Sequence, residues 1–172
     1  REKTTAPPPP ANDFAGLIDT SLQAQMLNNN ASAYFRLPFT VADASAIDGL
    51  TLKMKYDDGF QAYLNGVPVA GGNVPNVLTW NSGASERTAN ADAVQFESFN
   101  LNSGLSALQN GMNVLSIHGL NLDAANPDFL QLAQLDLTDV SAYSGTPLYL
   151  NNATPGSMNT NGTSTPGPSV FA

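Results

Sequence analysis

The sequence LTLKMKYDDGFQAYLNGVPVA, residues 50–70, decides the fold class. Apolar and polar side chains alternate before the two aspartates, and the alternation resumes after them. The apolar positions are Leu50, Leu52, Met54, Tyr56, Phe60, Ala62 and Leu64. A period of two is typical of a β-strand with one buried face. Asn65-Gly66 tolerates positive φ and predicts a tight hairpin turn, with residues 67–70 as the returning strand.

Residues 34–41 alternate in the same way, and residues 94–99, 113–120 and 129–137 are further strand candidates. In the first of these segments the inward side chains are Phe35, Leu37, Phe39 and Val41. Pro38 has no N–H to donate, so this segment is predicted to be an edge strand or to have its proline outside the hydrogen-bonded ladder.

In 129–137 the leucine spacing changes phase halfway along, which predicts a β-bulge near Ala133-Gln134. Short helical turns are expected at 42–47 and 101–108. Many short strands separated by turns rich in Gly, Pro and Asn indicate an all-β fold. We therefore predict one antiparallel β-sandwich of the jelly-roll, galactose-binding-like kind over residues 12–140.

The two ends differ from this middle part in composition. Residues 1–11 contain four consecutive prolines, which favour an extended polyproline II arm or linker. Residues 141–172 are rich in Gly, Pro, Asn and Thr and are predicted to form a second arm or linker. The first residues lack the apolar core of a signal peptide, so we expect a mature or mid-chain start.

Charge and cysteine content exclude several functions. Six Lys and Arg against fourteen Asp and Glu give a net charge of −8, which disfavours nucleic-acid binding. The chain has no cysteine, so disulfides, thiolate zinc sites and a cysteine nucleophile are excluded. No apolar run approaches the length of a membrane span.

Three segments resemble a recurrent β-sandwich module of large secreted planctomycete-type bacterial proteins. They are AYFRLPFTVADASAIDGLTLKMKYDDGFQAYLNGVPVA (33–70), LTWNS (78–82) and NGMNVLSIHGLNLDAANPDFLQLAQL (110–135). In such proteins the module lies beside lamin-tail and CotH-like domains, and TPGSMN (154–159) resembles a segment that follows lamin-tail modules. The module is similar to galactose-binding-like jelly rolls of bacterial glycosidases. The resemblance implies an extracellular accessory module with no established activity.

Asp57 and Asp58 lie at the corner between two predicted strands. Successive strand side chains point to opposite faces, so the pair shares one ligand only if the corner reorients it. The simplest role for Asp before Gly in a turn is to accept hydrogen bonds from nearby backbone N–H groups. The alternative is a calcium site, since a hard cation requires several oxygens and Asn65 lies close by in the sequence. A catalytic carboxylate pair is the third hypothesis.

A second oxygen-rich segment, NLDAANPD, spans residues 121–128. Asp123 and Asp128 flank it, and Asn121 and Asn126 supply amide oxygens. The simplest interpretation is a solvated hairpin loop. The alternative is a site for calcium or a polar ligand, to which Asn121 and the two aspartates would contribute.

The aromatic residues suggest a ligand platform. Trp80 follows a Gly-rich loop and is expected either to plug one end of the sandwich, which we favour, or to stack on a sugar ring. Tyr34 and Tyr63 are outward on their strands by the alternation and form a second candidate platform. The simpler alternative for the tyrosines is ordinary cross-strand packing.

His118, the only histidine, shares a strand face with Val114 and Ser116. A hydrogen-bonded, partly buried side chain is expected there rather than a catalyst, because no Ser-His-Asp pattern is present. A zinc site would require ligands from other chains.

We therefore expect a secreted or surface-attached, non-catalytic module. It would bind a polysaccharide or other glycan through loops and aromatic side chains, with structural calcium as an option. The alternative is a structural module of a surface layer or filament, in which the arms contact neighbouring copies. A fragment of a glycan-active enzyme is third.

Overall fold

The computed structural model describes residues 14–139 and the short strands at 149–150 and 162–163. The chain divides into two compact units, residues 1–139 and 140–172. The second unit contributes a two-stranded antiparallel pair, β8 (Tyr149–Leu150) and β9 (Gly162–Thr163). The predicted arms at 1–11 and 141–172 lie, apart from these strands, outside the described residues.

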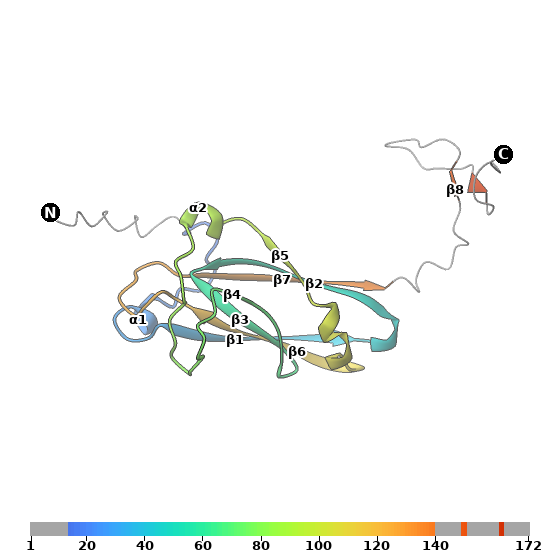
Figure 1. The fold of residues 1–172 in the computed structure, drawn as a ribbon, viewed down its shortest axis with the longest axis horizontal. Helices are drawn as coiled ribbons and strands as arrows, with labels where there is room; N and C mark the ends of the chain where they lie inside the picture. The colour runs from blue at the N-terminus through green and yellow to red at the C-terminus, as the bar shows by residue number, and fades with distance from the viewer. Residues whose placement is uncertain (1–13, 140–148, 151–161, 164–172) are drawn as a thin grey trace. The chain divides into compact units, whose positions relative to one another are not determined.

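Seven strands form the first unit (Figure 1). They are β1 (Ser32–Val41), β2 (Ile47–Asp57), β3 (Gly59–Leu64), β4 (Val67–Gly72), β5 (Glu97–Asn100), β6 (Gly111–Leu120) and β7 (Leu130–Asp139). Two short α-helices, α1 (Gln23–Met26) and α2 (Asn90–Ala93), lie toward the same end of the strands in Figure 1. Two 3₁₀ turns, η1 (Ala44–Ala46) and η2 (Asn102–Ala107), fall within the segments predicted to be helical.

The strands form two antiparallel sheets, one of four strands in the order β1-β6-β3-β4 and one of three in the order β5-β2-β7. The chain crosses between the sheets at every connection of this unit except the one from β3 to β4. The predicted all-β sandwich is therefore confirmed.

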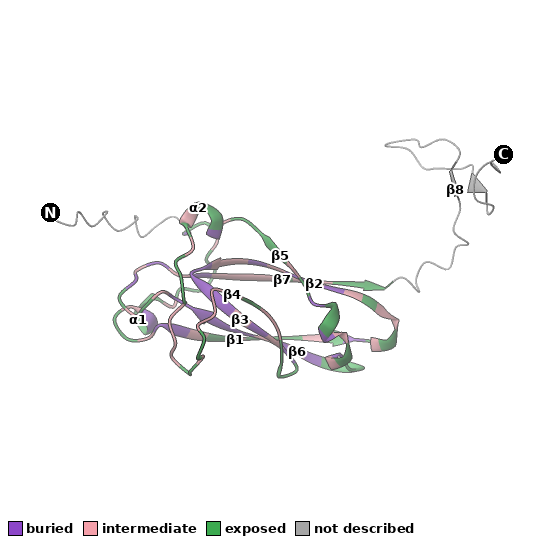
Figure 2. Ribbon diagram, viewed as in Figure 1, coloured by how far each residue is buried: buried purple, intermediate pink, exposed green. Residues whose placement is uncertain are grey.

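The core lies between the two sheets (Figure 2). Every second residue from Leu50 to Met54 in β2 and from Phe60 to Leu64 in β3 is fully buried, because these alternate side chains face the opposite sheet. The largest of these buried apolar side chains are Leu50, Leu52, Met54, Phe60 and Leu64. The alternation in 50–70 therefore identified the centre of the core.

The predicted bulge near Ala133-Gln134 is wrong. The register between β2 and β7 is continuous from Gly49 to Asp57 and shifts only beside Ile47. The leucines change phase because Leu130, at the start of β7, is buried on the face opposite to the one that packs on the main core. Ala133 and Leu135 pack on the main core, whereas Leu130 is buried in a second cluster with Phe14 and Ala93.

Two local predictions agree with the structure. β1 is an edge strand of its sheet, so the missing N–H of Pro38 is tolerated. Asn65 and Gly66 both have positive φ, 49° and 86°, in the turn between β3 and β4.

The strand predicted at 94–99 begins later, at Glu97, because α2 occupies the chain up to Ala93.

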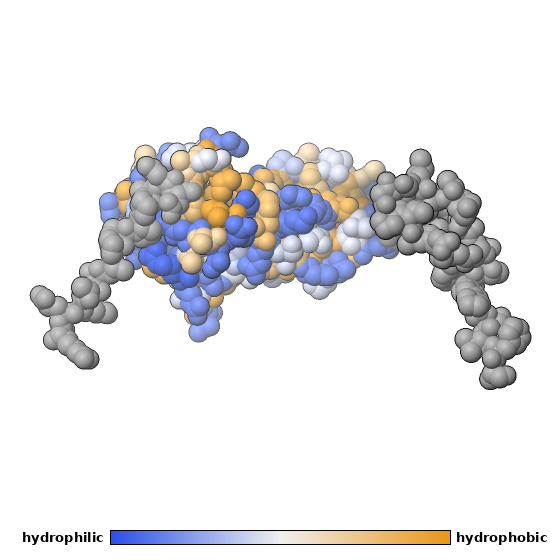
Figure 3. All heavy atoms as spheres, turned by 90° about the horizontal axis from the view of Figure 1, so that it is seen from above, coloured by the Kyte–Doolittle hydropathy of each residue, from blue (hydrophilic) through white to orange (hydrophobic). Residues whose placement is uncertain are grey.

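Hydrophobic side chains also reach the surface of the described unit. Figure 3 shows them interspersed with hydrophilic residues on the face seen from above. The large exposed ones include Trp80, Val77 and Met112. Among the described residues, no helix is long and apolar enough to cross a membrane.

Candidate functional site

Asp58 holds the corner where the chain passes from one sheet to the other. Its Oδ1 accepts a hydrogen bond from the Thr88 N–H at 3.0 Å. Its Oδ2 accepts from the Leu122 N–H at 2.8 Å and from Asn126 Nδ2 at 2.9 Å. Burial raises the pKa of Asp58, and the two backbone donors oppose that rise. The carboxylate thus ties two distant loops to the β2–β3 corner.

A glycine must follow the two aspartates because the backbones approach closely there. A Cβ at Gly59 would lie 2.8 Å from the carbonyl oxygen of Gly72 on β4. The peptide bond between Asp57 and Asp58 is cis.

Asp57 has a different environment from Asp58. It is fully buried, and neither of its carboxylate oxygens has a hydrogen-bond partner. Burial, followed by the charges of Asp58 and Asp128, raises the pKa of Asp57 to about 8. Of the adjacent pair, only Asp58 has the turn role expected from the sequence.

The five residues predicted to bind calcium do not assemble as one set. Asn65 lies at the far end of β6, where its side chain bonds to Asn113 and to the Val114 N–H. The Asp58 corner meets β6 at Leu120, about 20 Å away along the strand.

Asp123 and Asp128 have separate environments. The Oδ1 atom of Asp123 accepts hydrogen bonds from the N–H groups of Ala125 and Asn126 in its own loop. Asp128 is buried, and its Oδ2 accepts a hydrogen bond from Asn90 at 3.2 Å. In the part of the chain that the structure describes, no group of three or more His, Cys, Asp or Glu side chains has the arrangement of a metal site.

Trp80 does not plug the sandwich, so that prediction is wrong. Its side chain is 75% exposed on the loop between β4 and α2. The Trp80 carbonyl accepts a hydrogen bond from the Tyr34 hydroxyl at 2.7 Å, which connects the loop to β1.

Tyr34 lies over the buried ring of His118. The ring centroids are 4.3 Å apart and the planes are inclined by 22°. The Ser32 hydroxyl donates to the Ser82 carbonyl, so it accepts from Nε2–H of His118 at 2.7 Å. Burial lowers the pKa of His118. The histidine therefore has the hydrogen-bonded, structural role expected from the sequence.

The outer face of the four-stranded sheet carries polar and aromatic side chains in register. Tyr34, His118 and Gln61 form one cross-strand row, and Arg36, Ser116 and Tyr63 form the next. Tyr34 is 53% exposed, and its pKa is raised by burial and by the charge of Tyr63. We call Trp80, Tyr34 and Tyr63 the aromatic face. None of the four strands of this sheet, β1, β3, β4 and β6, contains Asp or Glu.

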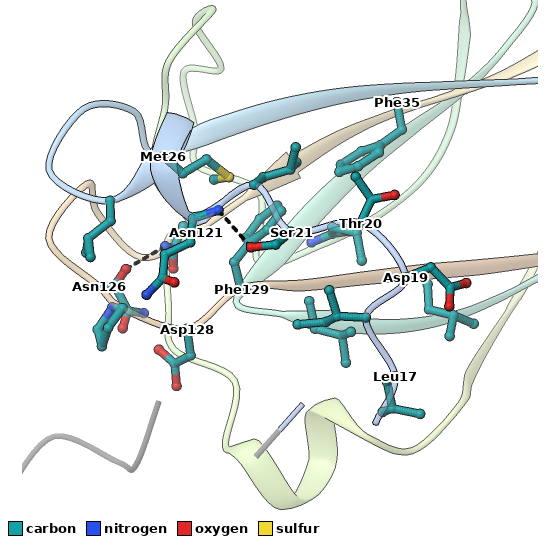
Figure 4. Close-up of a pocket in the computed structure, with 18 of the residues that line it drawn as sticks. Leu17, Asp19, Thr20, Ser21, Met26, Phe35, Asn121, Asn126, Asp128 and Phe129 are labelled. Carbon is teal, nitrogen blue, oxygen red and sulfur yellow. Dashed lines mark hydrogen bonds between the residues drawn. The ribbon is translucent and has the colours of Figure 1, made fainter. Parts of the chain in front are cut away.

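A cavity of about 440 Å³ lies on the opposite side of β1 (Figure 4). Phe35 of β1 and Phe129 stack in its apolar part with centroids 6.4 Å apart. Polar side chains at its margin come from the segment before β1 and from the loop before β7: Asp19, Thr20, Ser21, Gln23, Asn126 and Asp128.

The predicted ligand residue Asn121 also lines this cavity, but its amide is engaged internally. It donates to the Asn126 carbonyl at 3.0 Å and accepts from the Leu122 N–H. The sequence predicted Asn121 as a ligand residue. It predicted Phe35 only as an inward side chain of its strand, and not as part of a cavity. The cavity opens because β1 and β7 are unpaired edges of their sheets.

Comparisons with known proteins assign no family to this chain. No family model matches the chain, and no curated protein matches it. Among solved structures, Streptomyces avermitilis α-L-rhamnosidase complexed with L-rhamnose matches 65% of this chain at 18% identity, with a TM-score of 0.46. Native α-L-rhamnosidase from Aspergillus terreus matches 64% of this chain at 14% identity, with a TM-score of 0.40.

A β-D-mannosidase from Dictyoglomus thermophilum matches 53% of this chain at 18% identity, with a TM-score of 0.33. The chain spans only 9% of the S. avermitilis and D. thermophilum proteins and 13% of the A. terreus protein. A likeness this distant does not transfer an activity.

Proposed function

We propose that this protein is a non-catalytic, extracellular accessory module that binds carbohydrate through the aromatic face. The observation on which this rests is the exposed Trp80 side chain, which lies on a loop whose backbone is tied to Tyr34 by the bond from the Tyr34 hydroxyl to the Trp80 carbonyl. Sugar rings present apolar C–H faces, which pack on an exposed aromatic ring, and hydroxyl groups, which require hydrogen-bond partners.

Preorganisation of the aromatic face supports this proposal. The Tyr34 ring is fixed from below by His118 and at its hydroxyl by the Trp80 loop. Rigid binding groups lose little conformational freedom when a ligand binds, so more of the contact energy appears as affinity. Ser116 and Arg36 lie in the adjacent cross-strand row and supply hydrogen-bonding groups for sugar hydroxyls.

Binding rather than hydrolysis is favoured by the chemistry of this face. Most glycosidases require two carboxyl groups on either side of the scissile bond. The four strands beneath the aromatic face contain no Asp or Glu. The carboxyl groups of Asp57 and Asp58 are both fully buried in the β2–β3 corner, so neither reaches the surface.

The test is a glycan and polysaccharide array with the wild-type chain, Trp80→Ala and Tyr34→Ala. We expect selective binding to one glycan class, weakened at least tenfold in both variants, equivalent to ~1.4 kcal/mol. Phe96→Ala is the matched control, because Phe96 is an exposed aromatic residue on the other sheet's side of the chain. An array without signal at high protein concentration, or equal binding by all four proteins, would refute the proposal.

The alternative, an assembly module, is favoured by one observation. A shallow cavity of about 180 Å³ between the edges of β1 and β7 is lined by apolar side chains, among them exposed Leu37 and Leu137. Unpaired edge strands with apolar neighbours are able to receive a strand from another chain. Light scattering would reveal this as a mass that increases with concentration and falls in Leu37→Lys.

A further inference from the structure

Charged side chains are distributed unevenly between the two sheets. The strands of the four-stranded sheet contain no Asp or Glu, and Arg36 on β1 is their one Lys or Arg. The strands of the three-stranded sheet contain acidic residues and two lysines: Asp48, Asp57, Glu97, Asp136, Asp139, Lys53 and Lys55. In a chain of net charge −8, the strands beneath the aromatic face are therefore without acidic side chains.

Arg36 belongs to the same surface as the tyrosines of the aromatic face. On β1 the side chains of Tyr34 and Arg36 are exposed, whereas Phe35 between them packs on the core. Residues two apart on a strand point to one face and lie about 7 Å from each other. Arg36 is also in cross-strand register with Ser116, and Ser116 is in register with Tyr63. A ligand that packs on Tyr34 is thus within reach of the guanidinium group.

The two lysines of the described residues have partners on the other sheet, but Arg36 does not have an acidic one. Lys53 forms an ion pair with Asp136 at 2.7 Å, and Lys55 lies 4.9 Å from the centre of the Phe96 ring. In the part of the chain that the structure describes, no acidic side chain lies within ion-pair distance of Arg36. Its guanidinium group is therefore available to an anion from outside the chain.

The loop that carries Trp80 adds no net charge to this surface. Between β4 and α2 its charged residues are Glu86 and the adjacent Arg87. Repulsion from exposed carboxylates elsewhere on the chain is screened beyond about 8 Å at physiological ionic strength. An anionic ligand on the aromatic face consequently meets no acidic side chain from the strands beneath it.

We propose that the aromatic face binds an acidic polysaccharide and that Arg36 binds the carboxylate of a uronic acid ring. The planar guanidinium group donates two parallel hydrogen bonds to a carboxylate, which the ammonium group of lysine does not do. Trp80 and Tyr34 pack on the sugar ring, and the Ser116 hydroxyl bonds to a ring hydroxyl. The inference rests on the proposed carbohydrate binding and adds the class of ligand and the residue that selects it.

The experiment compares sodium polygalacturonate with its fully methyl-esterified form, because esterification removes the negative charge and leaves the sugar chain in place. Calorimetry at physiological ionic strength would measure both affinities for the wild-type chain, Arg36→Gln and Arg36→Lys. We expect the wild type to bind polygalacturonate at least fivefold more tightly than the ester, the size of one exposed ion pair with good geometry. Arg36→Gln should bind both forms equally, and Arg36→Lys should retain part of the preference.

Two further variants serve as controls. Lys55→Gln removes a positive charge from the other sheet and should leave the preference for polygalacturonate unchanged. Trp80→Ala tests the proposed function separately, because it should weaken binding of both forms. Unchanged melting temperatures of the Arg36 variants would show that the fold is intact.

Three results would overturn the inference while leaving carbohydrate binding in place: binding of neutral glycans alone, equal affinity of the wild type for both forms, or an unchanged preference in Arg36→Gln. Tighter binding of a sulfated galactan than of polygalacturonate would overturn the assignment to a carboxylate. Absence of binding to every charged and neutral glycan would refute the proposed function, and this inference with it.

Discussion

The ring of Tyr34 lies 4.3 Å from the ring of His118, so an exposed tyrosine rests on a buried histidine from the neighbouring strand. The same histidine donates through Nε2–H to Ser32, and Ser32 donates to the carbonyl of Ser82. A hydrogen-bonded chain therefore connects the sheet to the loop that carries Trp80. The geometry of the aromatic face depends on this inner connection as well as on its exposed rings.

Ser32→Ala should lower the free energy of unfolding by about 1–3 kcal/mol, because the buried His118 donor loses its acceptor. Urea denaturation would measure the change. Ser98→Ala on β5, an exposed strand position, should change stability by less than about 0.5 kcal/mol. Equal effects of the two substitutions would show that the His118–Ser32 bond does not contribute.

The free energy of unfolding should decrease as pH rises, because the buried carboxyl group of Asp57 has a raised pKa. The folded-state pKa of Asp57 is raised to about 8 by burial and by Asp58 and Asp128. In the unfolded chain an aspartate ionises near pH 4, so between about pH 4 and 8 the folded state binds more protons than the unfolded state. The favourable contribution is therefore complete below about pH 4 and is lost progressively up to about pH 8.

Asp57→Asn should remove this pH dependence, because the amide has nearly the shape of the neutral acid but does not ionise. Urea denaturation at a series of pH values would measure the free energy of unfolding of both proteins and test the prediction. A variant whose stability falls with pH as steeply as that of the wild type would assign the effect to another group.

Gly66→Ala should destabilise the β3–β4 hairpin by about 1 kcal/mol, since φ is +86° and a Cβ is disfavoured there. A Cβ at Gly66 would meet no atom within 4 Å, so the cost is conformational rather than steric. Gly16→Ala is the matched control, because Gly16 also has open space around it and has no positive φ. Thermal melting of both variants would separate the two effects.

Leu52→Ala should cost about 2–5 kcal/mol, because Leu52 is fully buried between the sheets and its removal leaves a cavity. Leu137→Ala should cost much less, since Leu137 is 37% exposed. Urea unfolding midpoints of the two variants provide the comparison. Similar losses would mean that the core is centred elsewhere.

The strands were predictable because their signals are local. The alternation from Leu50 to Leu64 and the Asn65-Gly66 turn depend on backbone geometry within a few residues. The bulge predicted near Ala133-Gln134 was wrong for a tertiary reason. Leu130 is buried on the outer face, and the sequence does not reveal that α2 and the segment around Phe14 cover the start of that face.

The candidate sites were less predictable than the strands. Asp57 and Asp58 look equivalent in the sequence, yet one is supplied with three hydrogen bonds and the other with none. The donors come from Thr88, Leu122 and Asn126, which are at least 30 residues away. No local pattern reports such distant partners.

The sequence by itself determined the fold class, the strand that lies at an edge, and the tyrosines that face outward, because each follows from side-chain alternation or from a missing backbone donor. Only the tertiary structure decided that Trp80 is exposed, that Tyr34 rests on His118, and that Asp57 and Asp128 are enclosed without donors. Those features arise where separate loops meet, and their energies depend on distances between residues far apart in the chain.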